Sequence, residues 1–140
     1  KLDVKGAIGR TLDDGFYAVG ALASWEDENK VRWILVPTGS NITALKLAGG
    51  KLEKGWASPE LVNPLTPTVV NGVVFAASAG SKTVKAKLFA YEGMTGKEVW
   101  NSGASIASYI TTGGLAAGGG RVYLSTVDGN QYAFGFPMEH

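Results

Sequence analysis

The sequence predicts an all-β protein built from many short antiparallel strands. Glycine accounts for 20 of the 140 residues and is scattered without a period of three, which is typical of many tight turns between short strands. Hydrophobic residues make up 45% of the chain, enough to bury a core. Helical spacing is not sustained anywhere, and the best candidate, PELVNPL, is interrupted by Pro64.

An internal repeat refines this prediction. The same strand-turn-strand pattern occurs in RWILVPTGS with ITALKLAGGK, in VVFAASAG with KLFAYEGMTGK, and in RVYLSTVDG with NQYAFGF. When the patterns are aligned on Ala44, Ala90 and Ala133, the steps between them are 46 and 43 residues. A period of about 40–50 residues that holds four short strands is typical of a blade of a β-propeller.

Spacing within the repeats predicts which residues are equivalent. In each repeat, an apolar residue precedes the aligned alanine: Ile34 precedes Ala44, Phe75 precedes Ala90, and Tyr123 precedes Ala133. The step is ten residues in the first and last repeats, and an insertion of five within SAGSKTVKAK lengthens it in the middle repeat. Gly50 and Gly96 each follow the aligned alanine by six residues. In RVYLSTV neither alternate face is strongly polar, which favours packing on both sides of a sheet.

The predicted order of elements follows from this alignment. Residues 1–20 are a lead-in with a turn at 12–15, residues 21–65 and 66–109 are two full blades, and residues 110–140 are part of a third. We expect strands near 18–25, 31–37, 42–48 and 52–57, near 67–71, 73–79, 86–92 and 97–101, and near 113–117, 121–126 and 130–135. The segment GGLAAGGG makes the first strand of the last blade weak. Asp128-Gly129 predicts a hairpin turn of the primed type.

Two full blades and three strands cannot close a ring of the usual four to eight blades. An open propeller would expose an apolar blade face and a bare strand edge. We therefore expect the remaining blades as partners, supplied by upstream sequence, by another chain or by symmetry copies of this one. The N-terminal segment KLDVKGAI can add an outer strand to a third blade.

Composition excludes several classes of function. A net charge of +1 gives no electrostatic footprint for nucleic acid, and no apolar stretch approaches the ~20 residues of a membrane span. The chain has no cysteine, and its one histidine is the terminal His140, so Ser-His-Asp, Cys-His and zinc sites cannot be built from it alone. We predict no catalytic and no metal residues in this chain.

Three other segments invite a binding interpretation. Carboxylates cluster at Asp13-Asp14 and in EDEN (26–29), but calcium needs six to eight ligands, and EDEN between two strands is better explained as a solvated hairpin loop. GGLAAGGG (113–120) fails as a phosphate loop because no helix and no Lys-Ser/Thr pair follows it. Its glycines instead predict close approach of the backbone to a central axis or a neighbouring blade.

The stretch LFAYEGMTGKEVWNSG resembles the repeat of pyrroloquinoline-quinone (PQQ) propellers, whose blades carry a docking motif Ala-x-Asp/Glu-x-x-Thr-Gly-x-x-x-Trp. The motif positions are held here by Ala90, Glu92, Thr95, Gly96 and Trp100. The resemblance covers about residues 18–138, and it implies that the turn and the Trp pack one blade onto the next. The first blade departs from the pattern, because Trp56 follows Gly50 by six residues rather than four.

The resemblance implies the C-terminal portion of a bacterial, periplasmic or extracellular quinoprotein-like propeller. Our preferred interpretation is a binding or scaffold domain without chemistry or cofactor of its own. The alternative is a fragment of a PQQ- and calcium-dependent alcohol or sugar dehydrogenase, and whether the whole protein is an enzyme stays open. The vicinal Cys pair that stacks the quinone in catalytic members is absent. Trp25 and Trp33 are less constrained than the docking tryptophans, and we expect them to line a surface or a funnel.

Overall fold

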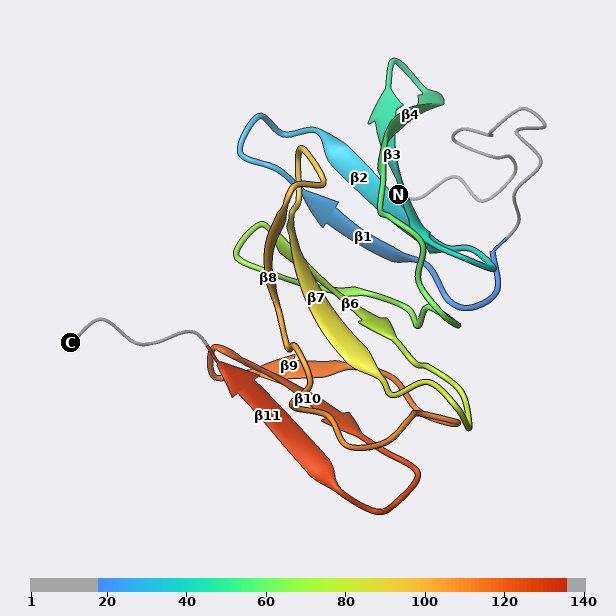
Figure 1. Cartoon of the computed structure of the whole chain (residues 1–140). Helices are drawn as coiled ribbons and strands as arrows, with labels where there is room; N and C mark the ends of the chain where they lie inside the picture. The colour runs from blue at the N-terminus through green and yellow to red at the C-terminus, as the bar shows by residue number, and fades with distance from the viewer. Residues whose placement is uncertain (1–17, 136–140) are drawn as a thin grey trace.

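A computed structural model describes residues 18–135. This part of the chain contains no helix and forms three antiparallel sheets that follow one another in space (Figure 1). The first sheet holds β1 (Ala23–Glu26), β2 (Arg32–Pro37), β3 (Ile42–Ala48) and β4 (Lys51–Ala57); the second holds β5 (Thr68–Val70), β6 (Val73–Ser78), β7 (Lys87–Glu92) and β8 (Glu98–Asn101); the third holds β9 (Ala116–Gly118), β10 (Arg121–Ser125) and β11 (Gln131–Gly135). Within these residues, no helix is long and apolar enough to cross a membrane.

The predicted all-β class and its eleven strands are confirmed, with corrections at two strand starts. The first strand begins at Ala23 rather than at residue 18, because Gly20 and its neighbours form a bend that is tied to the end of β2 by the Val19 N–H to Pro37 carbonyl bond, 2.9 Å long. Strand β9 begins at Ala116, three residues later than expected. The predicted lead-in at 1–17, including the closing strand KLDVKGAI and the turn at 12–15, lies outside the described residues.

Strand register agrees with the alignment in two of the three repeats and shifts it by one residue in the first. Phe75 is paired with Ala90, and Tyr123 with Ala133, as the spacing predicts. In the first sheet, however, the partner of Ala44 is Leu35, not Ile34. The connection between β2 and β3 spans only residues 38–41, whereas that between β10 and β11 spans 126–130. The step from Leu35 to Ala44 is therefore one residue shorter than the step from Tyr123 to Ala133. This shift matters because neighbouring residues on a strand point to opposite faces.

The fourth strands of the first two sheets share an irregularity. Ala44 is paired with Trp56 and Ala90 with Trp100, and each pairing is followed directly by a β-bulge. A bulge inserts an extra residue into one strand and re-aims the side chains beyond it. Both tryptophans therefore lie at the same register position beside the bulge, although they follow the preceding turn by different numbers of residues.

Two kinds of hairpin turn join the strands. Asn71-Gly72 and Gly119-Gly120 have positive φ at both residues, with values of 50°, 75°, 59° and 71°, as primed turns require. Asp128-Gly129 was predicted to be such a turn, and this is wrong. Only Gly129 has positive φ (83°), and the Thr126 N–H bonds to the Asn130 carbonyl at 3.0 Å, so the loop holds three residues.

Apolar side chains fill the two spaces between the sheets. Alternate residues of β6 serve both: Val74 and Ala76 pack toward the first sheet, whereas Phe75 and Ala77 pack toward the third. The first strands also come together, since β1 contacts β5 and β5 contacts β9. The second sheet, which lies between the other two, thus packs on both faces (Figure 1). In the third sheet, where RVYLSTV predicts two packed faces, the face of Tyr123 and Ser125 is exposed among the described residues.

The glycines of GGLAAGGG do not need the absence of a side chain to fit against the rest of the described chain. A side chain built at Gly113, Gly114, Gly118, Gly119 or Gly120 would meet nothing within 4 Å. The predicted close approach is therefore not seen among residues 18–135. Glycines that do meet a neighbour closely lie elsewhere: Gly55, Gly93 and Gly96 face tryptophan rings, and Gly80 faces the backbone of Val84.

Candidate functional site

The residues of the docking motif lie on β7, on the turn that follows it and on β8. Ala90 is fully buried opposite Trp100, whereas Glu92 and Thr95 are exposed. The turn is closed by two backbone bonds of 2.8 Å, from the Gly96 N–H to the Glu92 carbonyl and from the Glu92 N–H to the Lys97 carbonyl. Gly96 has φ of 74°, a conformation that glycine adopts without strain.

The partner of this turn is Trp56, which comes from the first sheet. Its Nε1–H donates a 2.8 Å bond to the carbonyl of Gly93, and its ring covers Gly96 so closely that a Cβ there would lie 2.6 Å from Cδ2. The ring also packs on Tyr91 with centroids 5.9 Å apart. Trp56 is 8% exposed, so this side chain of β4 is buried against the β7–β8 turn of the next sheet.

Tyr91 packs against the ring of Trp56. Its hydroxyl stays protonated near neutral pH. Burial, together with the nearby charge of Glu98, raises the pKa of its hydroxyl to about 12. Its ring is stacked on Phe89 at 6.0 Å. Tyr91 is 1% exposed, and it belongs with Trp56 to the core between the first and second sheets. We therefore assign it a packing role.

Trp100 makes an equivalent contact with the third sheet, but the contact is incomplete. Its ring packs on Phe134 with centroids 5.6 Å apart, and Phe134 is stacked on Tyr132 as Tyr91 is on Phe89. Trp100 is nevertheless 38% exposed. No turn among the described residues covers it as the β7–β8 turn covers Trp56, so only part of the predicted packing is present.

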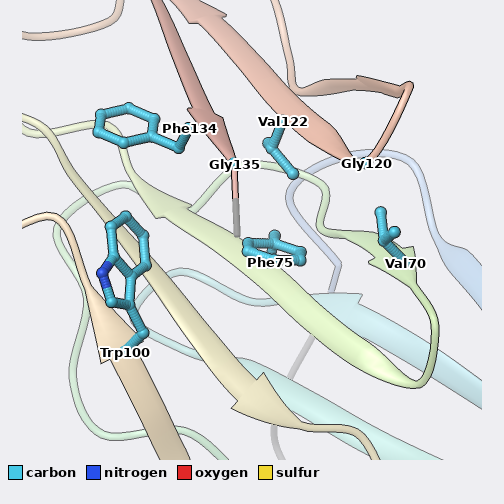
Figure 2. A pocket seen from close by; sticks show the side chains of 7 residues that line it. All are labelled: Val70, Phe75, Trp100, Gly120, Val122, Phe134 and Gly135. Carbon is cyan, nitrogen blue, oxygen red and sulfur yellow. The ribbon is translucent and has the colours of Figure 1, made fainter. Parts of the chain in front are cut away.

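A pocket of about 70 Å³ lies beside Trp100 (Figure 2). It lies between the second and third sheets, with Trp100 and Phe134 on one side and Val70 and Phe75 facing them. The lining is apolar; its members are Val70, Phe75, Trp100, Gly120, Val122, Phe134 and Gly135. No titratable side chain contributes to it, so the pocket offers packing surface rather than catalytic groups.

The expectation that Trp33 lines a surface or funnel is wrong. Trp33 is 3% exposed, and its Nε1–H donates a 2.9 Å bond to Oδ2 of Asp27. Trp25 is stacked on it with centroids 6.2 Å apart and is itself partly buried. Lys46 lies over the Trp33 ring at 5.5 Å. These rings thus belong to the packing of the first sheet.

Asp27 explains why EDEN is more than a solvated loop. Besides the Trp33 indole, its carboxylate accepts the N–H groups of Asn29 (2.8 Å) and Val31 (3.0 Å), and the residue is 5% exposed. The indole bond, aided by these backbone donors, lowers the pKa of the carboxyl below its usual value. The loop is a hairpin, as expected, but Asp27 anchors the core. Its signal in this sequence is its place directly after a strand and six residues before Trp33.

The described residues do not fit the quinone and calcium that the resemblance implies for catalytic propellers. Among residues 18–135, no three acidic or histidine side chains are grouped to hold a metal ion. The carboxylate of Asp27 is already engaged by its three N–H donors. The sequence has no cysteine to stack a quinone. We therefore derive no reaction step through these groups; Asp13 and Asp14 lie outside the described residues.

Comparisons with known proteins add no relative to this description. No protein-family model matches the chain, and no curated protein matches it significantly.

Proposed function

We propose that this chain is part of a quinoprotein-like β-propeller and serves as a binding or scaffold module whose partners are the remaining blades. In this proposal, the three sheets are successive blades of one ring. The ring displays its loops to a ligand, and the described residues provide architecture rather than chemistry. The proposal assigns the chain to the C-terminal blades, in a periplasmic or extracellular protein.

The observation that carries the proposal is the repetition of one inter-sheet contact. Trp56 meets Tyr91 of the second sheet, and Trp100 meets Phe134 of the third, from the same register position and at similar ring distances. The first strands of successive sheets approach each other, β1 with β5 and β5 with β9, as neighbouring strands around a common axis would. A contact that recurs with each sheet is expected to continue until the ring closes.

The far face of the third sheet supports a further partner. Tyr123 and Ala133 occupy the positions that Phe75 and Ala90 hold in the second sheet, where these residues form the packing surface for the next sheet. In the third sheet this face is exposed; its members include Ala116, Arg121, Tyr123, Ser125, Gln131 and Ala133. Tyr123 alone is 40% exposed. A moderately polar sheet face built around an aromatic residue fits a neighbouring blade.

The proposal can be tested with the variant Tyr123→Asp in the native protein with all of its chains. An aspartate at this position would bring a carboxylate into the contact with the next blade, so we expect a lower unfolding midpoint, or loss of chains from the particle where separate chains supply that blade. Val127→Asp is the matched control, because Val127 is an exposed residue at the β10–β11 loop, outside this face. Equal behaviour of the two variants would contradict the proposal.

A further inference from the structure

The fourth strands of the first two sheets lead into the same residue type, a serine two positions after the tryptophan. Ser58 follows Trp56, and Ser102 follows Trp100. Both serines are buried, with 7% and 5% of their surface exposed, and a buried hydroxyl needs a hydrogen-bond partner. The two hydroxyls find the same kind of partner.

Each serine is bonded twice to the third strand of its own sheet. The N–H of Ile42 donates to Oγ of Ser58 at 3.0 Å, and the N–H of Ser58 donates to the Ile42 carbonyl at 2.8 Å. In the second sheet, Leu88 and Ser102 exchange the same two bonds, each 2.9 Å long. Ile42 and Leu88 both precede the aligned alanine by two residues, so the serine contact recurs at one register position.

The third sheet has the third-strand half of this contact. Gln131 precedes Ala133 by two residues and is therefore equivalent to Ile42 and Leu88. Within the described part of the chain, β11 is paired with β10 alone and forms the edge of its sheet (Figure 1). Ala133 is exposed, whereas Ala90 is fully buried beside its fourth strand. By this equivalence, the N–H and carbonyl groups of Gln131 point away from β10 toward the outer edge.

We propose that the outer edge of β11 binds an antiparallel strand that carries Trp-x-Ser, with its tryptophan opposite Ala133 and its serine opposite Gln131. The serine hydroxyl accepts the N–H of Gln131, and the main chains of the two strands are hydrogen-bonded along the edge. The tryptophan takes the position of Trp56 and Trp100. Because the serine bonds only the main chain, a glutamine can stand where the other sheets have isoleucine and leucine.

This strand comes from polypeptide beyond the present sequence. The sequence holds four tryptophans, and only Trp56 and Trp100 have a serine two residues later. Both belong to fourth strands, β4 and β8, which are already paired within their own sheets. A second copy of the chain would have to break one of these sheets to donate its strand. The inference rests on the proposed function, because it names one strand of the missing partner.

Hydrogen exchange of single amides, measured in the native protein with all of its chains, shows whether the edge is paired. Two amides of the second sheet are the matched controls. The Leu88 N–H is bonded to Ser102, whereas the N–H of Asn101 points outward from β8, because that of its neighbour Ser102 points into the sheet. We expect Gln131 to be protected as Leu88 is, and to exchange on the order of tenfold more slowly than Asn101 after correction for intrinsic rates.

Three results would overturn the proposal. If Gln131 is as unprotected as Asn101 in a particle that holds further polypeptide, β11 binds no strand, although the proposed ring remains possible. If Gln131 is protected in a particle built only of copies of this chain, a second copy supplies the strand. If the particle is a monomer of this chain and Gln131 is unprotected, the ring and the strand are both contradicted.

A synthetic peptide tests which strand the edge prefers. The peptide KEVWNSG, the sequence of residues 97–103, is added to the 140-residue chain, and the thermal unfolding midpoint is measured. We expect the midpoint to rise, because a ligand that binds only the folded state stabilises it. Versions of the peptide with Trp100→Ala or Ser102→Ala should give clearly smaller rises. Equal midpoints with all three peptides, with or without a rise, would overturn the assignment of Trp-x-Ser to this edge. A larger rise with the peptide KLDVKGAI would also overturn it, because that segment carries no tryptophan.

Discussion

The two inter-sheet contacts differ in how completely they are closed. Trp56 is 8% exposed and is held by the Gly93 carbonyl and by the ring of Tyr91. Trp100 leaves its own sheet at the same register and meets Phe134 in a similar way, yet it is 38% exposed. The position of the tryptophan on its strand is therefore not what buries it. Burial requires the turn of the following sheet, where Gly93 lies 37 positions after Trp56 in the sequence.

Trp56→Ala should give the largest loss of stability. It removes a buried ring and leaves a cavity above Tyr91, so we expect unfolding free energy to fall by about 3–5 kcal/mol. Trp56→Phe, which keeps an aromatic ring but loses the bond to Gly93, should cost clearly less. Urea unfolding of the two variants measures both values. A loss below about 1 kcal/mol for the alanine variant would mean that Trp56 does not seal this interface.

Gly96→Val should come next, because it combines backbone strain with a collision. Gly96 has φ of 74°, and a side chain there would press on the Trp56 ring. We expect a loss of at least about 2 kcal/mol. Gly49→Val is the control, since Gly49 has φ of 56° but open space around it, and so isolates the strain. Equal losses at the two positions, again from urea unfolding, would remove the collision from the explanation.

Trp100→Ala should cost less than Trp56→Ala, about 1–2 kcal/mol, because part of the ring is already exposed. The difference in unfolding free energy between the two alanine variants measures how much more completely Trp56 is buried than Trp100. Chemical denaturation of both proteins under one condition gives this difference. A Trp100 variant as unstable as the Trp56 variant would mean that the second interface is sealed as tightly as the first.

Acid should weaken the first sheet through Asp27. The pKa of its carboxyl is lowered in the folded protein, so its contribution to stability is present above the unfolded value of about 3.9 and is lost as pH falls through the folded value. Asp27→Asn should flatten that part of the stability profile, whereas Glu28→Gln, in the same loop but exposed, should change it less. Unfolding midpoints measured from pH 5 downward test this smallest effect. An unchanged acid profile in Asp27→Asn would refute the assignment.

Much of the fold could be predicted from local signals. Glycine turns and alternating apolar residues located all eleven strands, and the alanine alignment identified the equivalent pairs of the second and third sheets. The pair in the first sheet was misplaced by one residue because loop length, which fixes register, cannot be read from strand residues alone. The turn at Asp128-Gly129 was misassigned because the same dipeptide serves hairpin loops of two and of three residues.

The candidate site was harder to predict because its contacts are long-range. The sequence marks Trp56 and Trp100 alike, and only the packing of the next sheet distinguishes them. Likewise, nothing in the sequence shows that the Trp33 indole donates to Asp27 across a hairpin. The glycines at 55, 93 and 96 looked like ordinary turn and strand residues, yet each makes room for a tryptophan ring. Such size matching, within the first sheet at Gly55 and between sheets at Gly93 and Gly96, becomes visible only once register is known.

In the proposed ring, a further sheet covers the exposed face of the third sheet. The mass of the native particle, together with the intact mass of each of its chains, shows whether such a sheet is present. We expect a particle larger than the 14.6 kDa of this sequence, in which further polypeptide or further copies cover the face around Tyr123 and Ala133. A stable, cooperatively unfolding particle of 14.6 kDa, with Tyr123 as exposed as it is here, would contradict it.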